Sequence, residues 1–408
     1  MEAEPLWKNP TYDLDFAQIS PAYRAFLEDY LLRYELDAAR FCRPLPYRDE
    51  MFFKALLPNF EYDISIAAFK FVEADMRFFD AYRQIVDGVF GGFEKLQSVM
   101  DFASGWGRLT RVLEQKLQPK QIWVSDIYHD AVAWQGEVFG VNTLPSTSAP
   151  DRLIHSQHHD IVFVGSMFSH LPAGLFEGWL QRLYAMLRPG GVLAFSVHDQ
   201  NILPPEHPAD PKGITYLKFS ESASLDADIY GMSYVTESFV GKAISQLSKT
   251  ASPSWCRFPK GLYENQDLYV VGAPGVDLTG LKVASSPMGG LDCVSQLPTR
   301  EYEFRGWAIE RTPQQEIDRI VVYVDGVERC DALLNSGRED VLDHFPGAAN
   351  TPVEWRFRLP EATTRSGGIV RIELRSSSAL VGYCYAEVPQ PTAMTYAGWT
   401  RRALRTTT

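Results

Sequence analysis

Short hydrophobic runs alternate with helical patterns through the middle of the chain. Four apolar runs end near residues 101, 125, 165 and 197, and each stops at small, polar or acidic residues. Between these runs, apolar positions recur at three- and four-residue spacing over residues 108–117, 130–139 and 175–187, and again over 235–247 after the last run. Strands that alternate with helices predict a mainly parallel sheet with right-handed crossovers, an α/β fold. Asp130 stands where the N-cap of the second helix is expected.

The hydrophobic period changes from helical to two after about residue 285. Apolar residues alternate with charged ones over 370–375, and residues 304–309, 320–324 and 355–359 show further short strand patterns. Asp325 and Gly326 form the dipeptide that favours a tight hairpin turn. We therefore expect an all-β sandwich over residues 285–390, followed by a tail at 391–408.

The first apolar run passes directly into a turn of small residues. It ends at Asp101 and continues through Ala103, Ser104, Gly105, Trp106 and Gly107 into a helical pattern. Small residues let a ligand approach the backbone, and the amides of the first helical turn point into the same space. A carboxylate beside this turn would repel a pyrophosphate but suits an ammonium group. Asp126 ends the next run 19 residues after Gly107, about where an acidic residue meets a ribose in nucleotide-binding α/β folds.

Four segments in this order resemble the successive motifs of class I S-adenosylmethionine-dependent methyltransferases. They are residues 101–108, Asp126, residues 165–171 and residues 187–191, and they are most similar to bacterial members found with polysaccharide and natural-product pathways. The resemblance spans roughly residues 95–275, because 265–271 resembles the terminal antiparallel strand of that Rossmann-like fold. One position departs from the family pattern, since the first motif glycine is Ala103 here.

The resemblance implies a binding site for S-adenosylmethionine. It assigns Asp101 and the turn residues to the methionine part of the donor, Asp126 to the ribose hydroxyls and Ile127 to the adenine. Trp106 lies either over the donor or beneath the turn, and a helix cap is the alternative role for Asp126. The implied donor-binding set is Asp101, Ala103, Ser104, Gly105, Trp106, Gly107, Asp126, Ile127, Gly165 and Ser166.

Histidines near the third and fourth strand ends are candidates for a catalytic base. If the acceptor is a hydroxyl, a group that titrates near neutral pH must take its proton. His170 is the first candidate, similar in place to the histidine base of small-molecule O-methyltransferases. Its alternative roles are to cap the following helix or to bond a backbone carbonyl. His198 at the next strand end is the second. His155, His158 and His159 lie in a polar segment without supporting acids, so we expect them to be solvated and expect no metal site.

The composition limits the classes of partner that we expect this protein to bind. The 408 residues carry a net charge of −12, which argues against a nucleic-acid partner. The five cysteines are scattered and favour reduced thiols. The N-terminus lacks a signal-peptide pattern, and no run approaches the ~20 apolar residues that span a bilayer. We expect a cytoplasmic protein of two or three domains without a membrane partner.

The segments around the predicted methyltransferase domain (93–275) have less specific patterns. Residues 1–92 read as a helical, aromatic-rich N-terminal cap that either packs on this domain or closes over the donor. The proline-rich insertion at 200–234 is interpreted as a substrate-side lid rather than a surface excursion. The sandwich loosely resembles immunoglobulin-like modules of bacterial glycan-modifying enzymes. Packing or dimerisation is favoured over carbohydrate binding, and dimerisation would give a homo-oligomer through this domain.

Together these patterns predict O-methylation of a sugar or another small polar metabolite by in-line transfer, with a small-molecule or glycan acceptor. A peptide, a carboxylate or an amine is the alternative acceptor. A donor-binding protein without turnover, acting through its sandwich, is the alternative from a different class. The absence of an Asp/Asn-Pro-Pro-Tyr/Phe motif after the third strand disfavours amino methylation of nucleic-acid bases.

Overall fold

The computed structural model describes residues 13–219, 222, 225–249, 252–263, 265–312, 315–342, 352–363, 368–377 and 380–388. The chain divides into two compact units. One unit is formed by Ala74–Val283, and the other joins Met1–Glu73 with Ala284–Thr408. Within the described part of the chain, no helix is both long and apolar enough to cross a membrane.

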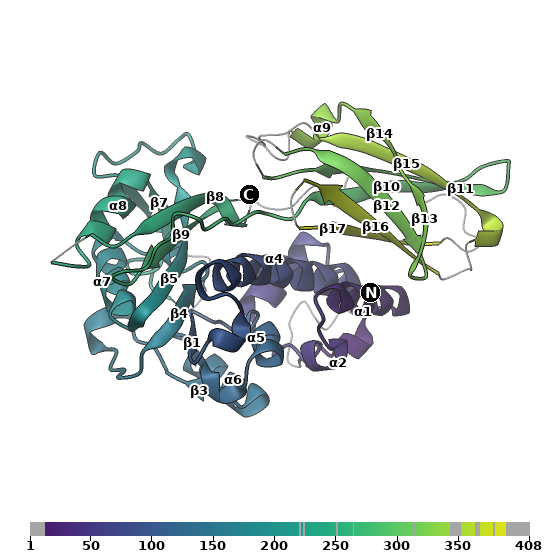
Figure 1. Ribbon diagram of the computed structural model, residues 1–408. Helices are drawn as coiled ribbons and strands as arrows, with labels where there is room; N and C mark the ends of the chain where they lie inside the picture. Colours follow the sequence, from purple (N-terminus) through teal and green to yellow (C-terminus); the bar gives the residue numbers. More distant parts are fainter. Residues whose placement is uncertain are drawn as a thin grey trace, which may run out of the picture. The chain divides into compact units, whose positions relative to one another are not determined.

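The unit of residues 74–283 is built on a nine-stranded sheet (Figure 1). The main path runs β3-β2-β1-β4-β5-β7-β6, and strands β3, β2, β1, β4 and β5 are parallel to one another. Strand β9 pairs antiparallel with β5, as expected for the terminal strand, and β8 pairs with β9. This confirms the predicted Rossmann-like fold. The strands are β1 (Val99–Phe102), β2 (Ile122–Ser125), β3 (Asn142–Thr143), β4 (His159–Val164), β5 (Leu187–Asp199), β6 (Ile214–Leu217), β7 (Met232–Val235), β8 (Trp255–Tyr263) and β9 (Gln266–Gly272).

Helices α5 (Thr110–Lys116), α6 (His129–Phe139), α7 (Ala173–Tyr184) and α8 (Glu237–Ser245) connect these strands. The first begins two residues later than its periodicity predicts, because residues 105–109 form turns. The prediction that Asp130 is an N-cap is wrong: Tyr128 holds that position and Asp130 lies in the first turn of α6. The hydroxyl of Thr236 does cap α8 by accepting the Phe239 amide hydrogen at 3.1 Å.

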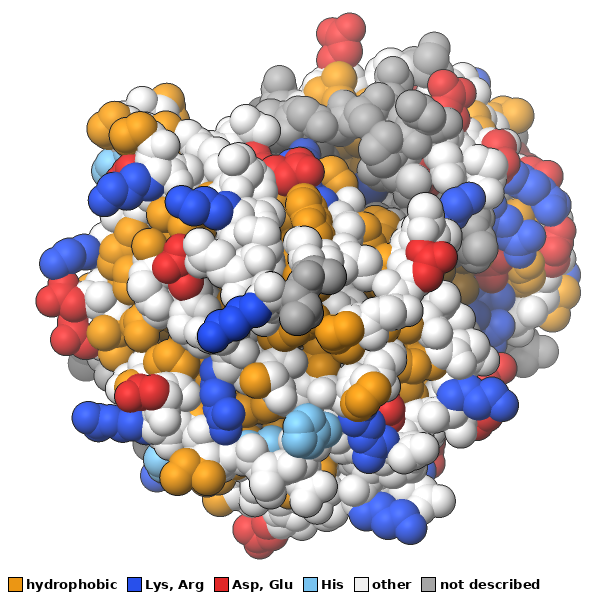
Figure 2. Space-filling view, turned by 60° about the vertical axis from the view of Figure 1, so that its left-hand side comes forward, with side chains coloured by type: hydrophobic (Ala, Val, Ile, Leu, Met, Phe, Trp, Pro, Cys, Tyr) orange, Lys and Arg blue, Asp and Glu red, His pale blue; other side chains and the backbone are white. Residues whose placement is uncertain are grey.

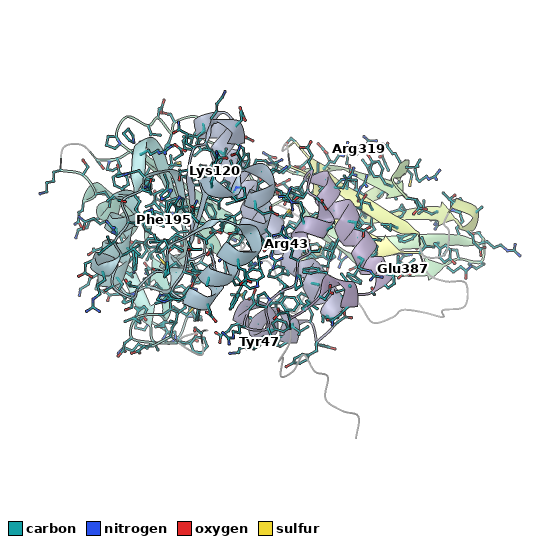
Figure 3. The ribbon with its side chains drawn as sticks, turned by 90° about the horizontal axis from the view of Figure 1, so that it is seen from below. Arg43, Tyr47, Lys120, Phe195, Arg319 and Glu387 are labelled. Carbon is teal, nitrogen blue, oxygen red and sulfur yellow. The ribbon has the colours of Figure 1, made fainter. Side chains whose placement is uncertain are left out.

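The core of this unit packs the sheet against α7 and α8. Phe195 of β5, fully buried, lies inside it (Figure 3). Its ring stacks on Tyr269 of β9 at 5.6 Å between centroids. This packing fixes the carboxyl ends of β1, β2, β4 and β5 at one edge of the sheet, which is where α/β folds bind ligands.

The insertion at residues 200–234 is partly a continuation of the sheet rather than a loop. It contains β6 and most of β7, and β7 pairs in parallel with the last residues of β5, where His198 lies opposite Tyr234. Ile214 and Tyr234 are buried. Prolines at 204, 205, 208 and 211 obscured this strand pair in the sequence. Residues 220, 221, 223 and 224 lie outside the described residues.

The unit that joins both ends of the chain contains two four-stranded antiparallel sheets around one core. One sheet has the order β10-β11-β15-β14 and the other β13-β12-β16-β17. All four predicted strand patterns are confirmed. Asp325 and Gly326 form the hairpin turn with φ of 47° and 78°. The strands are β10 (Met288–Gln296), β11 (Glu301–Ile309), β12 (Ile317–Val324), β13 (Val327–Asp331), β14 (Leu333–Ser336), β15 (Val353–Pro360), β16 (Ile369–Ser376) and β17 (Gly382–Glu387), with the short helix α9 (Glu339–Leu342).

N-terminal helices belong to the same unit as the sandwich. They are α1 (Pro21–Arg33), α2 (Ala38–Phe41), α3 (Leu57–Asn59) and the first part of α4 (Ile64–Phe90). Arg371 of β16 donates to both carboxylate oxygens of Asp29 at 2.8 and 2.9 Å, and Phe26 stacks on Tyr385 at 5.4 Å. The expected separate cap over residues 1–92 therefore divides: residues 1–73 group with the sandwich because aromatic side chains of α1 are buried against its sheet, whereas residues 74–92 belong to the other unit. The tail at 391–408 lies outside the described residues.

Candidate functional site

The turn after β1 contains three residues with left-handed backbone. Ala103, Gly105 and Gly107 have φ of 59°, 52° and 81°. A Cβ built on Gly105 would meet no atom within 4 Å, whereas one on Gly107 would lie 2.9 Å from the side-chain oxygen of Gln135. Gly105 therefore leaves open space beside the backbone for a ligand, and Gly107 permits close packing against α6.

Asp126, at the end of β2, holds this turn in place. Its Oδ2 accepts the Gly105 amide hydrogen at 2.8 Å and its Oδ1 accepts that of Tyr128 at 2.9 Å. Burial raises the pKa of Asp126, and the amide hydrogen bonds oppose that rise. The alternative of a helix cap is wrong because Tyr128 is the N-cap residue of α6. Ile127 follows in the chain and is half-buried.

Asp101 is a second buried carboxyl group near Asp126. The Thr110 hydroxyl donates to its Oδ2 at 3.0 Å. Burial raises the pKa of Asp101 to about 7, with further increases from the charges of Asp126 and Asp75, while the Thr110 hydrogen bond opposes them. Two carboxyl groups that disfavour each other's ionisation make a region that a cation would stabilise.

Helix α4 contributes three contacts to this region that sequence reasoning missed. Asp75 accepts a hydrogen bond from Nε of Arg108 at 2.6 Å, and the Arg108 guanidinium lies 5.7 Å from the Phe78 ring centroid. A Cβ on Gly165 would overlap the same Phe78 ring. The spacing of Asp75 and Phe78, three residues apart on one helix face, was the available signal.

The end of β4 is fixed by a closed set of buried hydrogen bonds. Ser166 has a left-handed φ of 57°, and its amide donates to the Ser196 hydroxyl at 2.8 Å. The Ser196 hydroxyl donates to the side-chain oxygen of Gln266 at 2.7 Å. The Gln266 amide nitrogen donates back to the Ser166 hydroxyl at 2.8 Å. Gln266, which sequence reasoning missed as a site residue, thus orients the predicted donor-binding residue Ser166.

The two predicted catalytic histidines lie together. His170, in the short helix Phe168–His170, donates from Nδ1 to the Gly231 carbonyl at 2.7 Å, and its ring stacks on Tyr230 at 4.6 Å. The backbone-carbonyl bond was one of the two alternatives expected for this residue. The other, a cap on the following helix, is wrong because Pro172 is the N-cap residue of α7. The rings of His170 and His198 are 6.0 Å apart. Burial lowers the pKa of His198 to about 4, with a smaller contribution from His170.

Of the other histidines, His159 contradicts the sequence prediction. It is fully buried at the start of β4, where its Nδ1 lies 2.8 Å from the Ser98 hydroxyl and its Nε2 lies 2.9 Å from Nε2 of His155. Burial lowers the pKa of His159 to about 3. The expectation of solvated side chains is therefore wrong for His159 and holds for the exposed His158. No group of three or more His, Cys, Asp or Glu side chains in the described residues is arranged to hold a metal ion.

Trp106 and the insertion complete the surroundings. The Trp106 ring packs edge-on against Trp134 of α6 at 6.0 Å. The insertion contacts the loop after β2, where the hydroxyls of Tyr128 and Ser222 lie 2.6 Å apart. The same insertion supplies Gly231 to His170. It therefore contacts both the predicted donor loop and the histidine pair. On the face drawn in Figure 2, Lys and Arg side chains are spread among acidic and uncharged ones.

Comparison with known proteins gives a family match. The model of a methyltransferase domain matches residues 74–233. The chain is 25% identical over 127 residues to a malonyl-[acyl-carrier protein] O-methyltransferase of Calditerrivibrio nitroreducens, an alignment that covers 31% of this chain and 49% of that protein. The chain thus spans about half the length of this curated relative.

Solved structures with similar folds have low sequence identity. The DhpI-SAM-HEP complex is 17% identical, with 54% of this chain and 99% of that chain covered and a TM-score of 0.34. An O-methyltransferase family protein from Burkholderia thailandensis is 15% identical, with 61% and 70% covered and a TM-score of 0.35.

The family match supports a methyltransferase domain at residues 74–233, for which S-adenosylmethionine is the expected cofactor. The residues present fit that cofactor. The open space beside Gly105 accommodates a ligand against the backbone, and the carboxyl groups of Asp101 and Asp126 suit a cationic donor that carries ribose hydroxyls.

Proposed function

We propose that this protein is a methyltransferase that uses S-adenosylmethionine to methylate a hydroxyl group of a sugar or another small polar metabolite. The observation that carries this proposal is the pair of buried carboxyl groups, Asp101 and Asp126, on neighbouring strand ends around the open turn at Gly105. A pyrophosphate would be repelled by this arrangement, whereas the ammonium group and sulfonium of the donor are attracted.

In this proposal different residues around the turn bind different parts of the donor. Asp101, with Ala103, Ser104, Gly105 and Gly107, surrounds the methionine part. Asp126 binds the ribose hydroxyls with the lone pairs left by its two amide hydrogen bonds, and Ile127 contacts the adenine. Gly165 and Ser166 form the wall at the end of β4. Support comes from the rigid hydrogen bonding of this wall and from the free space at Gly105.

The bound donor would supply a methyl group from its sulfonium, and the sulfur would leave as a neutral thioether. The protein holds the acceptor in line with that methyl group, and such positioning contributes about 7–11 kcal/mol in well-oriented reactions. His170 or His198 takes the proton of the acceptor hydroxyl. The position of both rings at the carboxyl edge of the sheet supports this role.

We further propose that the insertion at 200–234 is the substrate-side lid. Its contacts with Tyr128 on one side and His170 on the other support this assignment. A lid that touches both the donor loop and the histidine pair would exclude water from the transfer. The sandwich is proposed as a packing or dimerisation module.

Isothermal titration calorimetry with S-adenosylmethionine and S-adenosylhomocysteine tests the donor site. We expect both compounds to bind, and we expect Asp126→Ala to weaken binding at least about tenfold through loss of a charged hydrogen-bonding partner. Asp130→Ala is the matched control, because Asp130 is an exposed carboxylate four residues away. No heat of binding to the wild-type protein would refute the proposed function.

Mass spectrometry then separates an enzyme from a donor-binding scaffold. The protein is incubated with S-adenosylmethionine and small sugars, and a product heavier by one methylene group is sought. Donor binding without any such product, across hydroxyl, amine, carboxylate and peptide acceptors, would favour the scaffold alternative.

A further inference from the structure

His198 has a ring nitrogen that is buried without a hydrogen-bond partner among the described residues. The atom is Nδ1, and the side chain is 3% exposed. An unpaired polar atom in such surroundings costs about 1–3 kcal/mol. Such an atom calls for an explanation, and a catalytic role is one that applies at the edge of a predicted site.

The ring of His198 is neutral near pH 7, because burial lowers its pKa to about 4. The backbone of Ser233 opposes this shift, which is the effect of a carbonyl that attracts a ring proton. Since Nδ1 makes no such contact, the ring proton belongs on Nε2. Nδ1 then carries the lone pair and accepts hydrogen bonds.

Among the described residues, no neighbouring group donates a hydrogen bond to Nδ1 of His198. The His170 ring lies 6.0 Å away and its own Nδ1 proton is donated to the Gly231 carbonyl. The Tyr234 ring lies at 5.6 Å. The carboxylate of Asp199, the next residue, pairs with Arg257 at 2.5 Å. His170 is thus oriented by the backbone, while the buried lone pair of His198 faces no donor in the described residues.

We propose that Nδ1 of His198 receives the hydrogen of the acceptor's nucleophilic group, and that this site takes hydroxyl or neutral amine acceptors rather than carboxylates. The inference rests on the proposed function. For a hydroxyl, the oxygen forms a bond to the methyl carbon as the sulfur–methyl bond breaks. Its O–H electron pair stays on oxygen, its proton moves to Nδ1, and the sulfonium becomes a neutral thioether. His170 is a positioning residue.

The substrate class follows from hydrogen-bond polarity. A lone pair attracts the hydrogen of an O–H or N–H group, but an ionised carboxylate offers only lone pairs of its own. This polarity acts against carboxylate binding and in favour of a neutral hydrogen-bond donor.

Nitrogen NMR of histidine-labelled full-length protein tests the protonation state without any reaction. At pH 7, we expect the His198 ring to show a non-protonated Nδ1 and a protonated Nε2, and we assign the signals by their loss in His198→Asn. A protonated Nδ1 would overturn the proposal. Donor calorimetry on the same sample reports separately on the proposed function.

Transfer of a labelled methyl group tests the role in catalysis and the substrate class. The probes are methyl glucoside, glucosamine and glucuronic acid with methyl-labelled S-adenosylmethionine. Ethers and methylamines keep the label in mild base, whereas a methyl ester releases it as methanol. We expect base-stable label, and base-labile label on glucuronic acid would overturn the substrate class while leaving the methyltransferase function intact. If no probe is labelled, the ring-nitrogen result decides the proposal.

Variants of His198 complete the test. His198→Phe keeps a ring but removes the acceptor, so we expect kcat to fall about 100-fold with donor affinity within about twofold of the wild type. His198→Asn places an amide near the former Nδ1, and we expect it to recover part of the rate. The exposed His158→Asn is the matched control and keeps full activity. Full activity in His198→Phe would overturn the proposal. If that variant fails to bind donor, His198→Asn decides, with wild-type activity the opposing result.

Discussion

Replacing Gln266 with Leu removes the side chain that closes the hydrogen bonds around Ser166. The Gln266 amide contacts Ser166 twice, at 2.8 Å and 3.1 Å, and accepts from Ser196 at 2.7 Å. Gln266 is 7% exposed. Leucine has a similar size but no polar atoms, so the substitution leaves two hydroxyl groups without their amide partner and little new space for water.

The magnitude follows from these two hydroxyl groups. Each buried group that loses its partner costs about 1–3 kcal/mol, and the Ser196 hydroxyl keeps the Ser166 amide as a donor. We expect Gln266→Leu to lower the free energy of unfolding by about 2–4 kcal/mol. Release of the left-handed backbone at Ser166 is expected to raise the dissociation constant for S-adenosylhomocysteine about tenfold, because the wall of the predicted donor site loses its fixed position.

Urea unfolding followed by tryptophan fluorescence measures stability, and calorimetry measures donor-product affinity. A double-mutant cycle with Ser196→Ala is expected to give a coupling of about 0.5–3 kcal/mol, the range for residues in one hydrogen-bond network. Gln181→Leu, at an exposed position of α7, is the matched control and changes neither quantity. Wild-type stability and affinity in Gln266→Leu would refute the reasoning that this network fixes the site.

Three further predictions follow from individual contacts. Ala103→Gly relieves a left-handed φ of 59°. Glycine also raises the entropy of the unfolded chain, so we expect the free energy of unfolding to rise by only about 0.5 kcal/mol, as measured by thermal unfolding. A lower free energy of unfolding would contradict the strain argument. Burial raises the pKa of Asp101 to about 7 from 3.8, so its contribution to stability is full below about pH 4 and is lost as the pH rises through 7. Donor affinity should rise from pH 6 to 8 as Asp101 ionises, and calorimetry on Asp101→Asn should show a flatter profile. Asp29→Ala removes the partner of the largely buried Arg371 and should lower the free energy of unfolding in urea by about 2–3 kcal/mol. Asp331→Ala, in an exposed ion pair, should lower it by less than about 1 kcal/mol. Equal losses would contradict the packing of α1 on the sandwich.

Local sequence patterns predicted most of the elements that carry the proposed donor site. The run that ends at Asp101 is a strand, the small residues after it form the turn, and Gly105 and Gly107 adopt the left-handed backbone that glycine permits. Ala103 does the same without being glycine. These features depend on contiguous residues, whose burial period and backbone preferences act over a few positions.

The histidines show where local patterns fail. His159 looked like part of a polar segment, but strand pairing at the start of β4 turns its side chain into a buried position beside Ser98. Whether His170 binds a carbonyl depends on Gly231, which is 61 residues away in the chain. Neither contact has a signal in the spacing of nearby residues.

The sequence by itself determined the strand and helix patterns, the small-residue turn and the acidic residues at two strand ends, since each follows from steric and hydrophobic preferences of neighbouring residues. Only the tertiary structure decided which distant groups meet. Sheet order brings Gln266 to Ser166 across 100 residues, and the sandwich sheet rather than a separate cap buries the face of α1. Such contacts depend on how layers pack, and many orders of the same elements satisfy the same local preferences.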